Sequence, residues 1–354
     1  MKLVKASGEW SDIGEAIGSD CRRELRTELE YVRRIGDLTG VLDEVEAMLD
    51  VFRYEVEAYS EPYMELMKGM ASGSGLTLDE VTLIHVGYEA MLWTPRWGCT
   101  SFAVCPEASS NGDTVIGQTI DLPEMLSDCV VALHIETVED VRAFIVCVPG
   151  MIYTGINSEG VGLCVNMLNP GEVRRGVPAS VVSWEALMTG RLSEALNTVM
   201  EANRASGMNY LLADKDGNVF SVETTPDRFR VLEPVEGLLV HANHYVSEAF
   251  RDLDALVVGS PDTLIRQQRL RRFLEKHRGR IDERLLHEAL KDHSNYPDSI
   301  CCHPDPEAVP EYRWKTVAVT LYNLTSGRAR VFGGNPCKAS WSDFKEFGVM
   351  KPPR

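Results

Sequence analysis

The sequence predicts an α+β protein in which β-sheets are covered by helices and form one structural domain. Three observations support this prediction. The first 92 residues have helical periodicity, many short β-rich runs follow from residue 97 onward, and further helical segments lie among and after those runs. Because no internal repeat, low-complexity segment or obvious linker separates these regions, we do not expect two independent domains.

The helical lead is divided by residues with turn chemistry. Apolar residues recur at helical spacing over residues 13–35 and 42–68, and the run ASGSG at 71–75 interrupts the pattern. Thr77 and Glu80 have capping-box spacing, in which each side chain caps the backbone of the other residue. This pair predicts a helix that begins at Thr77 and continues to about residue 92.

The remainder of the chain alternates between expected strands and expected helices. The strands cover residues 115–122, 130–136, 143–148, 161–166 and 238–245, with hairpins at 209–232 and 314–332 that turn at 214–217 and 325–327. The helices cover residues 179–204, 261–277 and 283–291.

The composition is that of an ordinary globular protein with an acidic balance. Among its 354 residues, 36 Lys and Arg stand against 53 Asp and Glu, which gives a formal net charge of −17. This excess argues against a partner such as nucleic acid or an anionic membrane, because both require a basic face. The start lacks a signal-peptide core, and the longest uncharged stretch, residues 143–158, is too short and polar to span a bilayer. We therefore expect a cytoplasmic protein with mostly reduced cysteines.

Cys99 is the candidate nucleophile. It lies in the sequence WGCTS at 97–101, where the helical lead meets the first strand. Gly98 removes side-chain bulk and permits unusual backbone angles, which suits attack of the Cys99 thiol on the Gly98 carbonyl. Hydrolysis of the resulting thioester would free the Cys99 α-amine, whose ordinary pKa of ~7.7–8.0 lets it act as a base toward its own thiol. The alternative is a buried structural cysteine that follows a turn.

The order of downstream segments resembles the penicillin acyltransferase family of Ntn (N-terminal-nucleophile) hydrolases. The segments are GCTSF at 98–102, GQTID at 117–121, GINSEGVGL at 155–163, VETTP at 222–226, HANHY at 241–245, DPEAVPEYRWKT at 305–316 and GGNP at 333–336. They run in consistent order within a match from about residue 76 to residue 336. The resemblance implies a four-layer αββα sandwich of two antiparallel sheets flanked by helices.

The resemblance also implies site residues beyond Cys99. The family's aspartate corresponds to Asp121, whose carboxylate would hold and orient the α-ammonium of mature Cys99. Asn243, on a β-rich run, is a neutral amide donor of the kind that stabilises an oxyanion without titrating. The alternatives are a turn cap for Asp121 and a loop-closing hydrogen bond for Asn243.

Two further residues resemble site residues of the more distantly related choloylglycine hydrolases. Asn166 resembles their oxyanion asparagine, and for this residue a catalytic and a structural role both stay open. Arg266 resembles the arginine of their helical Ser-x-x-Arg pattern, although Thr263 stands in place of the serine.

Other chemistries receive less support. No metal site is expected, since His241 and His244 lack the spacing and the glutamate of a zinc-protease helix, and CCH at 301–303 has no partner Cys-x-x-Cys. A papain-like pair of Cys99 and His244, which would need no cleavage, is the catalytic alternative. A non-catalytic binding or scaffold protein on an Ntn-like fold is the alternative without catalysis.

These observations together predict an Ntn-type cysteine amidohydrolase or acyltransferase that acts on a linear amide bond. Autocatalytic cleavage between Gly98 and Cys99 would give a helical chain of residues 1–98 and a second chain of residues 99–354, which stay associated as one structural domain. No metal or organic cofactor is expected. The expected substrate is a small N-acyl amine or a peptide-like molecule, and an acyl-CoA is a candidate acyl donor.

Overall fold

Two β-sheets form the centre of the molecule. The structure is a computed structural model and describes residues 1–92 and 98–349. Within these residues, one sheet has eight strands in the order β1-β4-β5-β6-β7-β8-β9-β10, and the other has six in the order β11-β2-β3-β12-β13-β14. The strands of the first sheet are β1 (Lys2–Gly8), β4 (Val131–Thr137), β5 (Arg142–Val148), β6 (Met151–Asn157), β7 (Val161–Met167), β8 (Met208–Asp214), β9 (Val219–Thr224) and β10 (Phe229–Leu232). Those of the second sheet are β2 (Gly98–Val104), β3 (Val115–Pro123), β11 (Leu238–His241), β12 (Trp314–Asn323), β13 (Arg328–Gly333) and β14 (Lys345–Gly348).

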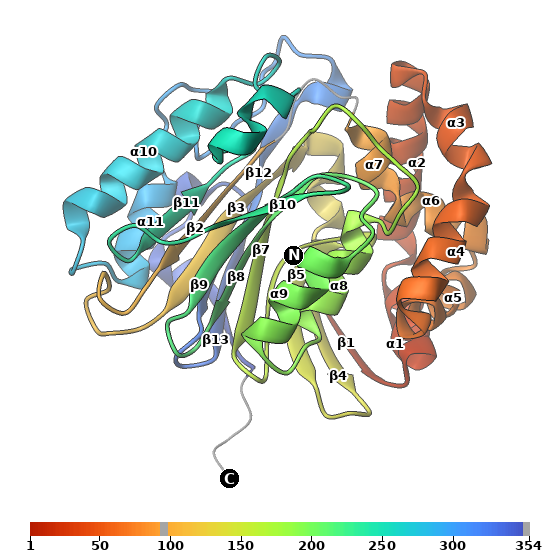
Figure 1. Cartoon of the computed structure of the whole chain (residues 1–354), viewed down its shortest axis with the longest axis horizontal. Helices are drawn as coiled ribbons and strands as arrows, with labels where there is room; N and C mark the ends of the chain where they lie inside the picture. The colour runs from red at the N-terminus through yellow and green to blue at the C-terminus, as the bar shows by residue number, and fades with distance from the viewer. Residues whose placement is uncertain (93–97, 350–354) are drawn as a thin grey trace.

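Helices cover the outer face of each sheet, which completes four layers (Figure 1). On the side of the eight-stranded sheet lie α1 (Trp10–Asp20), α2 (Arg22–Thr39), α3 (Leu42–Ala47), α4 (Leu49–Tyr59), α5 (Glu61–Ser74), α6 (Leu78–His85), α7 (Gly87–Met91), α8 (Ala179–Leu187) and α9 (Leu192–Glu201). On the side of the six-stranded sheet lie α10 (Asp262–His277) and α11 (Glu283–Leu290). The predicted α+β class and αββα order are therefore confirmed.

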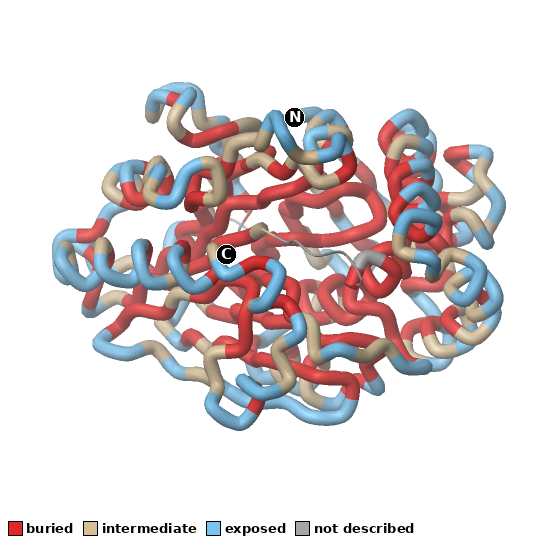
Figure 2. The backbone as a smooth tube through the Cα atoms, turned by 90° about the horizontal axis from the view of Figure 1, so that it is seen from above, coloured by how far each residue is buried: buried red, intermediate tan, exposed pale blue. Residues whose placement is uncertain are grey.

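Most of the core lies between the sheets and beneath the N-terminal helices. Figure 2 shows buried backbone through both sheets and exposed residues on the outer helices. A second apolar cluster joins the six-stranded sheet to α10 and α11, where Phe102 and Val104 of β2 belong to the same cluster as Leu270 and Leu274. No helix of the described chain combines the length and the apolar character that crossing a bilayer requires.

Several predicted elements are confirmed and others need correction. The Thr77 capping box exists: Thr77 Oγ1 accepts from the Glu80 N–H at 3.2 Å, and Glu80 Oε2 accepts from the Thr77 N–H at 3.0 Å. The interruption expected at residues 71–75 occurs only at its end, since α5 continues to Ser74 and Gly75 is its C-cap.

The prediction of an entirely helical lead is wrong, because residues 2–8 form β1. This strand pairs in parallel with β4, whereas the other strand pairs of the two sheets are antiparallel. Only Val4 and Ala6 are buried along β1, so its alternation is too short to stand out in sequence. The strand β6 was also not predicted, because its fully buried run shows no alternation.

The strand predicted over residues 238–245 ends earlier than expected. The strand β11 stops at His241, and residues 242–245 form a loop that follows it. Asn243 is therefore a loop residue, which frees its side chain from the in-and-out alternation that a strand would impose.

Candidate active site

Cys99 is the second residue of β2 and is 4% exposed. The predicted position of Cys99 at the start of a strand is thus correct, while Trp97 of the same sequence segment lies outside the described residues. The Cys99 thiol interacts electrostatically with Tyr153 and Cys164 on the facing sheet, which places it between the two sheets. Burial, and secondarily the Asp121 carboxylate, raise the pKa of the Cys99 thiol to about 12. The thiol is therefore protonated at neutral pH.

Gly98 lies directly opposite Asp121 in the β2–β3 ladder. A β-carbon at position 98 would stand 2.7 Å from the Cβ of Asp121 and 3.0 Å from its Oδ2. Only glycine at position 98 therefore leaves enough space for the Asp121 side chain.

Asp121 is buried and is held from the neighbouring strand. Thr316 Oγ1 on β12 donates to Asp121 Oδ1 at 2.7 Å, and the same hydroxyl accepts from the Cys302 N–H at 2.9 Å. The β3–β12 register shifts between Thr316 and Ala318, so an irregularity adjoins the pair of Thr316 and Asp121. Bulges of this kind re-aim side chains next to functional sites.

Asn243 bonds directly to the backbone of Cys99. Its Oδ1 accepts from the Cys99 N–H at 2.8 Å and from Arg266 Nη2 at 3.2 Å. Because a peptide N–H and a guanidinium can only donate, these two partners determine which end of the amide is the oxygen. The Nδ2 group donates to the Met167 carbonyl at 3.3 Å, and the Asn243 N–H donates to Thr263 Oγ1 at 2.7 Å.

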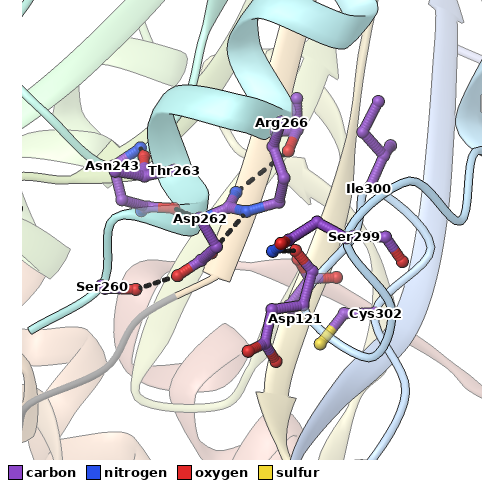
Figure 3. A network of polar contacts seen from close by, with 12 residues as sticks. Asp121, Asn243, Ser260, Asp262, Thr263, Arg266, Ser299, Ile300 and Cys302 are labelled. Carbon is purple, nitrogen blue, oxygen red and sulfur yellow. Dashed lines mark hydrogen bonds and ion pairs between the residues drawn. The ribbon is translucent and has the colours of Figure 1, made fainter.

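Arg266 of α10 binds the carbonyl of the same residue, Cys99. Its Nη1 donates to the Cys99 carbonyl at 2.7 Å and to Thr100 Oγ1 at 3.0 Å, and its Nε donates to Asp262 Oδ2 at 2.9 Å. Burial opposes the charged form, but the Asp262 and Asp121 carboxylates outweigh it and raise the pKa of Arg266. Figure 3 shows Asp262 beside Arg266, with Asn243 and Asp121 nearby.

Asn166 lies on β7 and faces β2 across the space between the sheets. Its Oδ1 accepts from Ser101 Oγ at 2.6 Å and from Asn209 Nδ2 at 3.0 Å, and Ser101 is two residues beyond Cys99. The Nδ2 group of Asn166 is buried and has no hydrogen-bond partner within the described part of the chain. Because a buried unsatisfied donor costs about 1–3 kcal/mol, this amide is a candidate for donation to a ligand.

A buried ion pair anchors the loop that carries Asn243. His241 Nε2 lies 2.9 Å from Glu223 Oε1, and His241 Nδ1 lies 2.7 Å from the Ala242 carbonyl oxygen. Each ring nitrogen of His241 thus lies against an oxygen atom, and the two contacts fix the orientation of the ring. Glu223 also accepts from the N–H groups of Val246 and Ser247, so it binds both ends of the loop.

His244 does not form the papain-like pair. Its Nδ1 lies 3.0 Å from Thr263 Oγ1, and no hydrogen bond of the described residues joins it to Cys99. Burial, with the charge of His241, lowers the pKa of His244 to about 4, so its ring is neutral at physiological pH. His244 lines a cavity of about 620 Å³ beside α10, which Cys99 does not line.

The fold thus brings Cys99, Asp121, Asn243 and Arg266 into one contact network, with Asn166 close to it. Sequence reasoning missed the three residues that hold them: Thr316, Asp262 and Thr263. Asp262 had a readable signal, because a carboxylate four residues before an arginine on a helix is a favourable pair. Thr263 had one as well, because it stands in place of the serine of the Ser-x-x-Arg pattern. Thr316 had none, since this threonine becomes recognisable only through its neighbours in space.

The four-layer fold is that of the Ntn-hydrolase class. Residues 108–338 match the sequence model of the family described as "Acyl-coenzyme A:6-aminopenicillanic acid acyl-transferase", and the chain belongs to this family. The matched region begins after Cys99 and contains Asp121, Asn166, Asn243 and Arg266.

Three solved structures illustrate what the backbone of this chain resembles. A Caenorhabditis elegans N-acylethanolamine-hydrolyzing acid amidase ortholog is 15% identical, with a TM-score of 0.46, over 64% of this chain and 93% of that one. A conjugated bile acid hydrolase from Clostridium perfringens is 12% identical, with a TM-score of 0.47, over 72% and 99%. Penicillin V acylase from Agrobacterium tumefaciens is 12% identical, with a TM-score of 0.44, over 72% and 99%. At these identities the similarity concerns the fold. A search of curated proteins finds no match to this chain.

Proposed function

We propose that this protein is an Ntn-type cysteine amidohydrolase or acyltransferase that uses Cys99 as its nucleophile and matures by cleavage between Gly98 and Cys99. Membership of an acyltransferase family supports amide hydrolysis or acyl transfer. The observation that carries the assignment to Cys99 is the restraint of both its backbone N–H and its backbone carbonyl. Its N–H is bound by Asn243 at 2.8 Å and its carbonyl by Arg266 at 2.7 Å.

Maturation would begin with attack of the Cys99 sulfur on the Gly98 carbonyl carbon. The C–N bond between the two residues breaks, the nitrogen takes up a proton, and a thioester joins residue 98 to the sulfur. Water then hydrolyses the thioester, which leaves a carboxylate on Gly98 and a free thiol and α-amine on Cys99. Burial keeps the thiol protonated, so its proton must leave during the attack, and the Cys99 nitrogen takes up this proton as the C–N bond breaks. The α-amine that this cleavage releases can then act as the base toward its own thiol.

The same groups would then process a substrate amide. The thiol attacks the acyl carbonyl while its proton passes to the α-amine, and the amine product leaves with that proton. Water or an acceptor amine takes the acyl group from the thioester. Asp121, across the ladder from residue 98, would orient the α-ammonium.

The oxyanion would be bound by an asparagine amide. Asn243 is our first candidate, because Nδ2 carries two hydrogens and the long contact with Met167 uses one. Asn166 is the second candidate, since its Nδ2 is buried without a partner among the described residues. Removal of one such donor typically costs about 2.7–4 kcal/mol of transition-state stabilisation.

The substrate would be a small N-acyl amine or a peptide-like amide, and an acyl-CoA is a candidate donor because the family description includes one. The two cleaved chains would remain associated, since β1 of the first is a strand of the sheet to which β4 of the second belongs. Catalysis requires neither a metal nor an organic cofactor, because the base and the nucleophile belong to one residue.

Denaturing mass spectrometry and activity measured on one sample test the proposal. Protein expressed from the intact gene should give two masses that split between residues 98 and 99, and should hydrolyse members of a panel of N-acyl amines. Cys99→Ala should give one intact mass and no activity, while Cys105→Ala, at another buried cysteine just after β2, should still be cleaved. Active protein of one intact mass would disprove cleavage, and activity in Cys99→Ala would exclude Cys99 as the nucleophile.

A further inference from the structure

A cluster of two cysteines and two histidines lies outside the network around Cys99. His293 follows α11, Cys301 and His303 lie on the loop that leads to β12, and Cys337 belongs to a 3-10 turn, η4 (Pro336–Lys338). One nitrogen or sulfur atom from each side chain lies within 4.8 Å of the corresponding atoms of the other three. Cys301 and His303 have no partner Cys-x-x-Cys in the sequence, which is why no metal site is expected there, but the fold supplies His293 and Cys337.

The four side chains converge on one point at the His303 ring. His303 Nε2 lies 3.1 Å from His293 Nε2 and 3.5 Å from each of the sulfurs of Cys301 and Cys337. One ring nitrogen carries either a proton or a lone pair, so it forms one hydrogen bond and not three. Hydrogen bonding among these four residues therefore does not account for the convergence.

A tetrahedral metal accounts for these distances. Bonds of about 2.0–2.1 Å to nitrogen and about 2.3 Å to sulfur place two nitrogen ligands about 3.3 Å apart, and a nitrogen and a sulfur about 3.5 Å apart. The donor set of two thiolates and two imidazoles in this geometry is typical of zinc. Both Cys301 and Cys337 are free of disulfides, so both sulfurs are available as ligands.

We propose that His293, Cys301, His303 and Cys337 bind a structural zinc ion. Four protein ligands close the coordination shell, which distinguishes a structural site from a catalytic one. The surroundings also suit a thiolate: the Asn335 amide donates to Cys301 Sγ at 3.7 Å while donating to the Cys302 carbonyl at 2.6 Å. Outer partners of this kind orient metal ligands. His293 is exposed, so the site opens to solvent.

The zinc ion would fasten a loop that contacts the candidate active site. Cys302, between two ligands, donates its N–H to Thr316 Oγ1, and its carbonyl accepts from the Thr316 N–H at 3.0 Å. Thr316 in turn donates to Asp121. Figure 3 shows Cys302 beside Asp121. Zinc would therefore join the loop after α11 to η4. It would also restrain the backbone at Cys302, which holds the Thr316 hydroxyl that donates to Asp121.

Metal analysis of the full chain, purified under reducing conditions, tests the site directly. Wild-type protein should contain about one zinc per chain, because a closed site with two thiolates binds zinc tightly. Replacement of zinc by cobalt should produce the visible bands of tetrahedral Co²⁺ and a charge-transfer band from thiolate to cobalt. A chain that contains no zinc and takes up neither metal overturns the proposal.

Variants locate the metal within the chain. Cys337→Ser and His293→Ala change residues that are not fully buried, and both should lose most of the bound zinc and the tetrahedral cobalt spectrum. Cys105→Ala and His277→Ala are matched controls outside the cluster and should keep both. If Cys337→Ser fails to fold, the zinc content of His293→Ala, at the exposed ligand, tests the assignment alone. Zinc content that is unchanged in either folded ligand variant, or equally reduced in the controls, overturns the assignment.

Discussion

A side chain at position 98 would collide with Asp121. A β-carbon on Gly98 would lie 2.7 Å from the Cβ of Asp121, closer than two carbon atoms can approach without displacement. The size of the residue before the cleavage position therefore limits where the Asp121 carboxylate can lie, because the β2–β3 register sets residues 98 and 121 opposite each other.

Gly98→Ala should therefore slow maturation and destabilise the protein. Overpacking of this kind typically lowers the free energy of unfolding by about 1–3 kcal/mol. The added methyl group would displace the Asp121 side chain. Cleavage can be followed by intact mass over time, and stability by urea denaturation. Gly348→Ala is the matched control, because its added carbon would meet no heavy atom within 4 Å in the described part of the chain beyond its two chain neighbours. Cleavage of Gly98→Ala at the wild-type rate would show that the contact has no role in maturation.

Asp121→Asn should both impair maturation and lower the pKa of the Cys99 thiol. After burial, the Asp121 charge is the next cause that raises this pKa, so its removal makes the thiolate easier to form. Maturation should still suffer, since the Cys99 nitrogen becomes an ammonium as the C–N bond to Gly98 breaks and would then lack its carboxylate. Rates of thiol alkylation and of cleavage, each measured across pH, separate the two effects.

The exposed Asp128, in the segment after β3, provides the control Asp128→Asn, which should behave as wild type. Normal maturation of Asp121→Asn, with an unchanged pH profile and rate, would reduce Asp121 to a structural residue.

Asn243→Ala should lower kcat by about 10²–10³ with little change in KM, because it removes a donor to charge that develops in the transition state. Asn166→Ala is the paired variant, since the Asn166 Nδ2 has no hydrogen-bond partner among the described residues and is the other candidate. Steady-state kinetics on fully cleaved protein discriminate between them. A near-normal kcat for Asn243→Ala together with a large loss for Asn166→Ala would transfer the oxyanion role to Asn166.

Glu28→Gln should stabilise the protein at alkaline pH. Burial raises the pKa of Glu28 to about 8, although the Gly150 N–H bonded to the carboxylate opposes the shift. The folded state therefore binds this proton more tightly than the unfolded state, whose glutamate has a pKa of ~4.3. The stabilisation is complete below the unfolded pKa and is lost as pH rises to about 8.

Urea unfolding at about pH 5 and about pH 8 measures this effect. The wild type should lose a few kcal/mol more than Glu28→Gln between these conditions, because each pKa unit corresponds to about 1.4 kcal/mol. The exposed Glu30 gives the control Glu30→Gln, which should follow the wild type. Equal pH dependence in all three proteins would contradict a buried, protonated Glu28.

Much of the fold could be predicted because local chemistry determines it. The capping box at Thr77 and the turns at 214–217 and 325–327 depend on residues close in sequence, and all three are confirmed. The strands β1 and β6 were missed for opposite reasons. One buries too few residues to show alternation, and the other is buried on both faces and shows none.

For the candidate site, the sequence by itself determined which residues are chemically suited to act: a cysteine after a glycine, a nearby aspartate and two distant amides. Only the tertiary structure decided how they meet. The β2–β3 register places Asp121 opposite Gly98, the early end of β11 turns the Asn243 oxygen toward Cys99, and α10 carries Arg266 to the Cys99 carbonyl. The same holds for Cys337, which joins Cys301 and His303 from a separate turn. Capping and turn formation depend on residues close in sequence and can therefore be predicted from it. The convergence of distant side chains depends on strand register and on the packing of the layers, and these are determined by contacts along the whole chain.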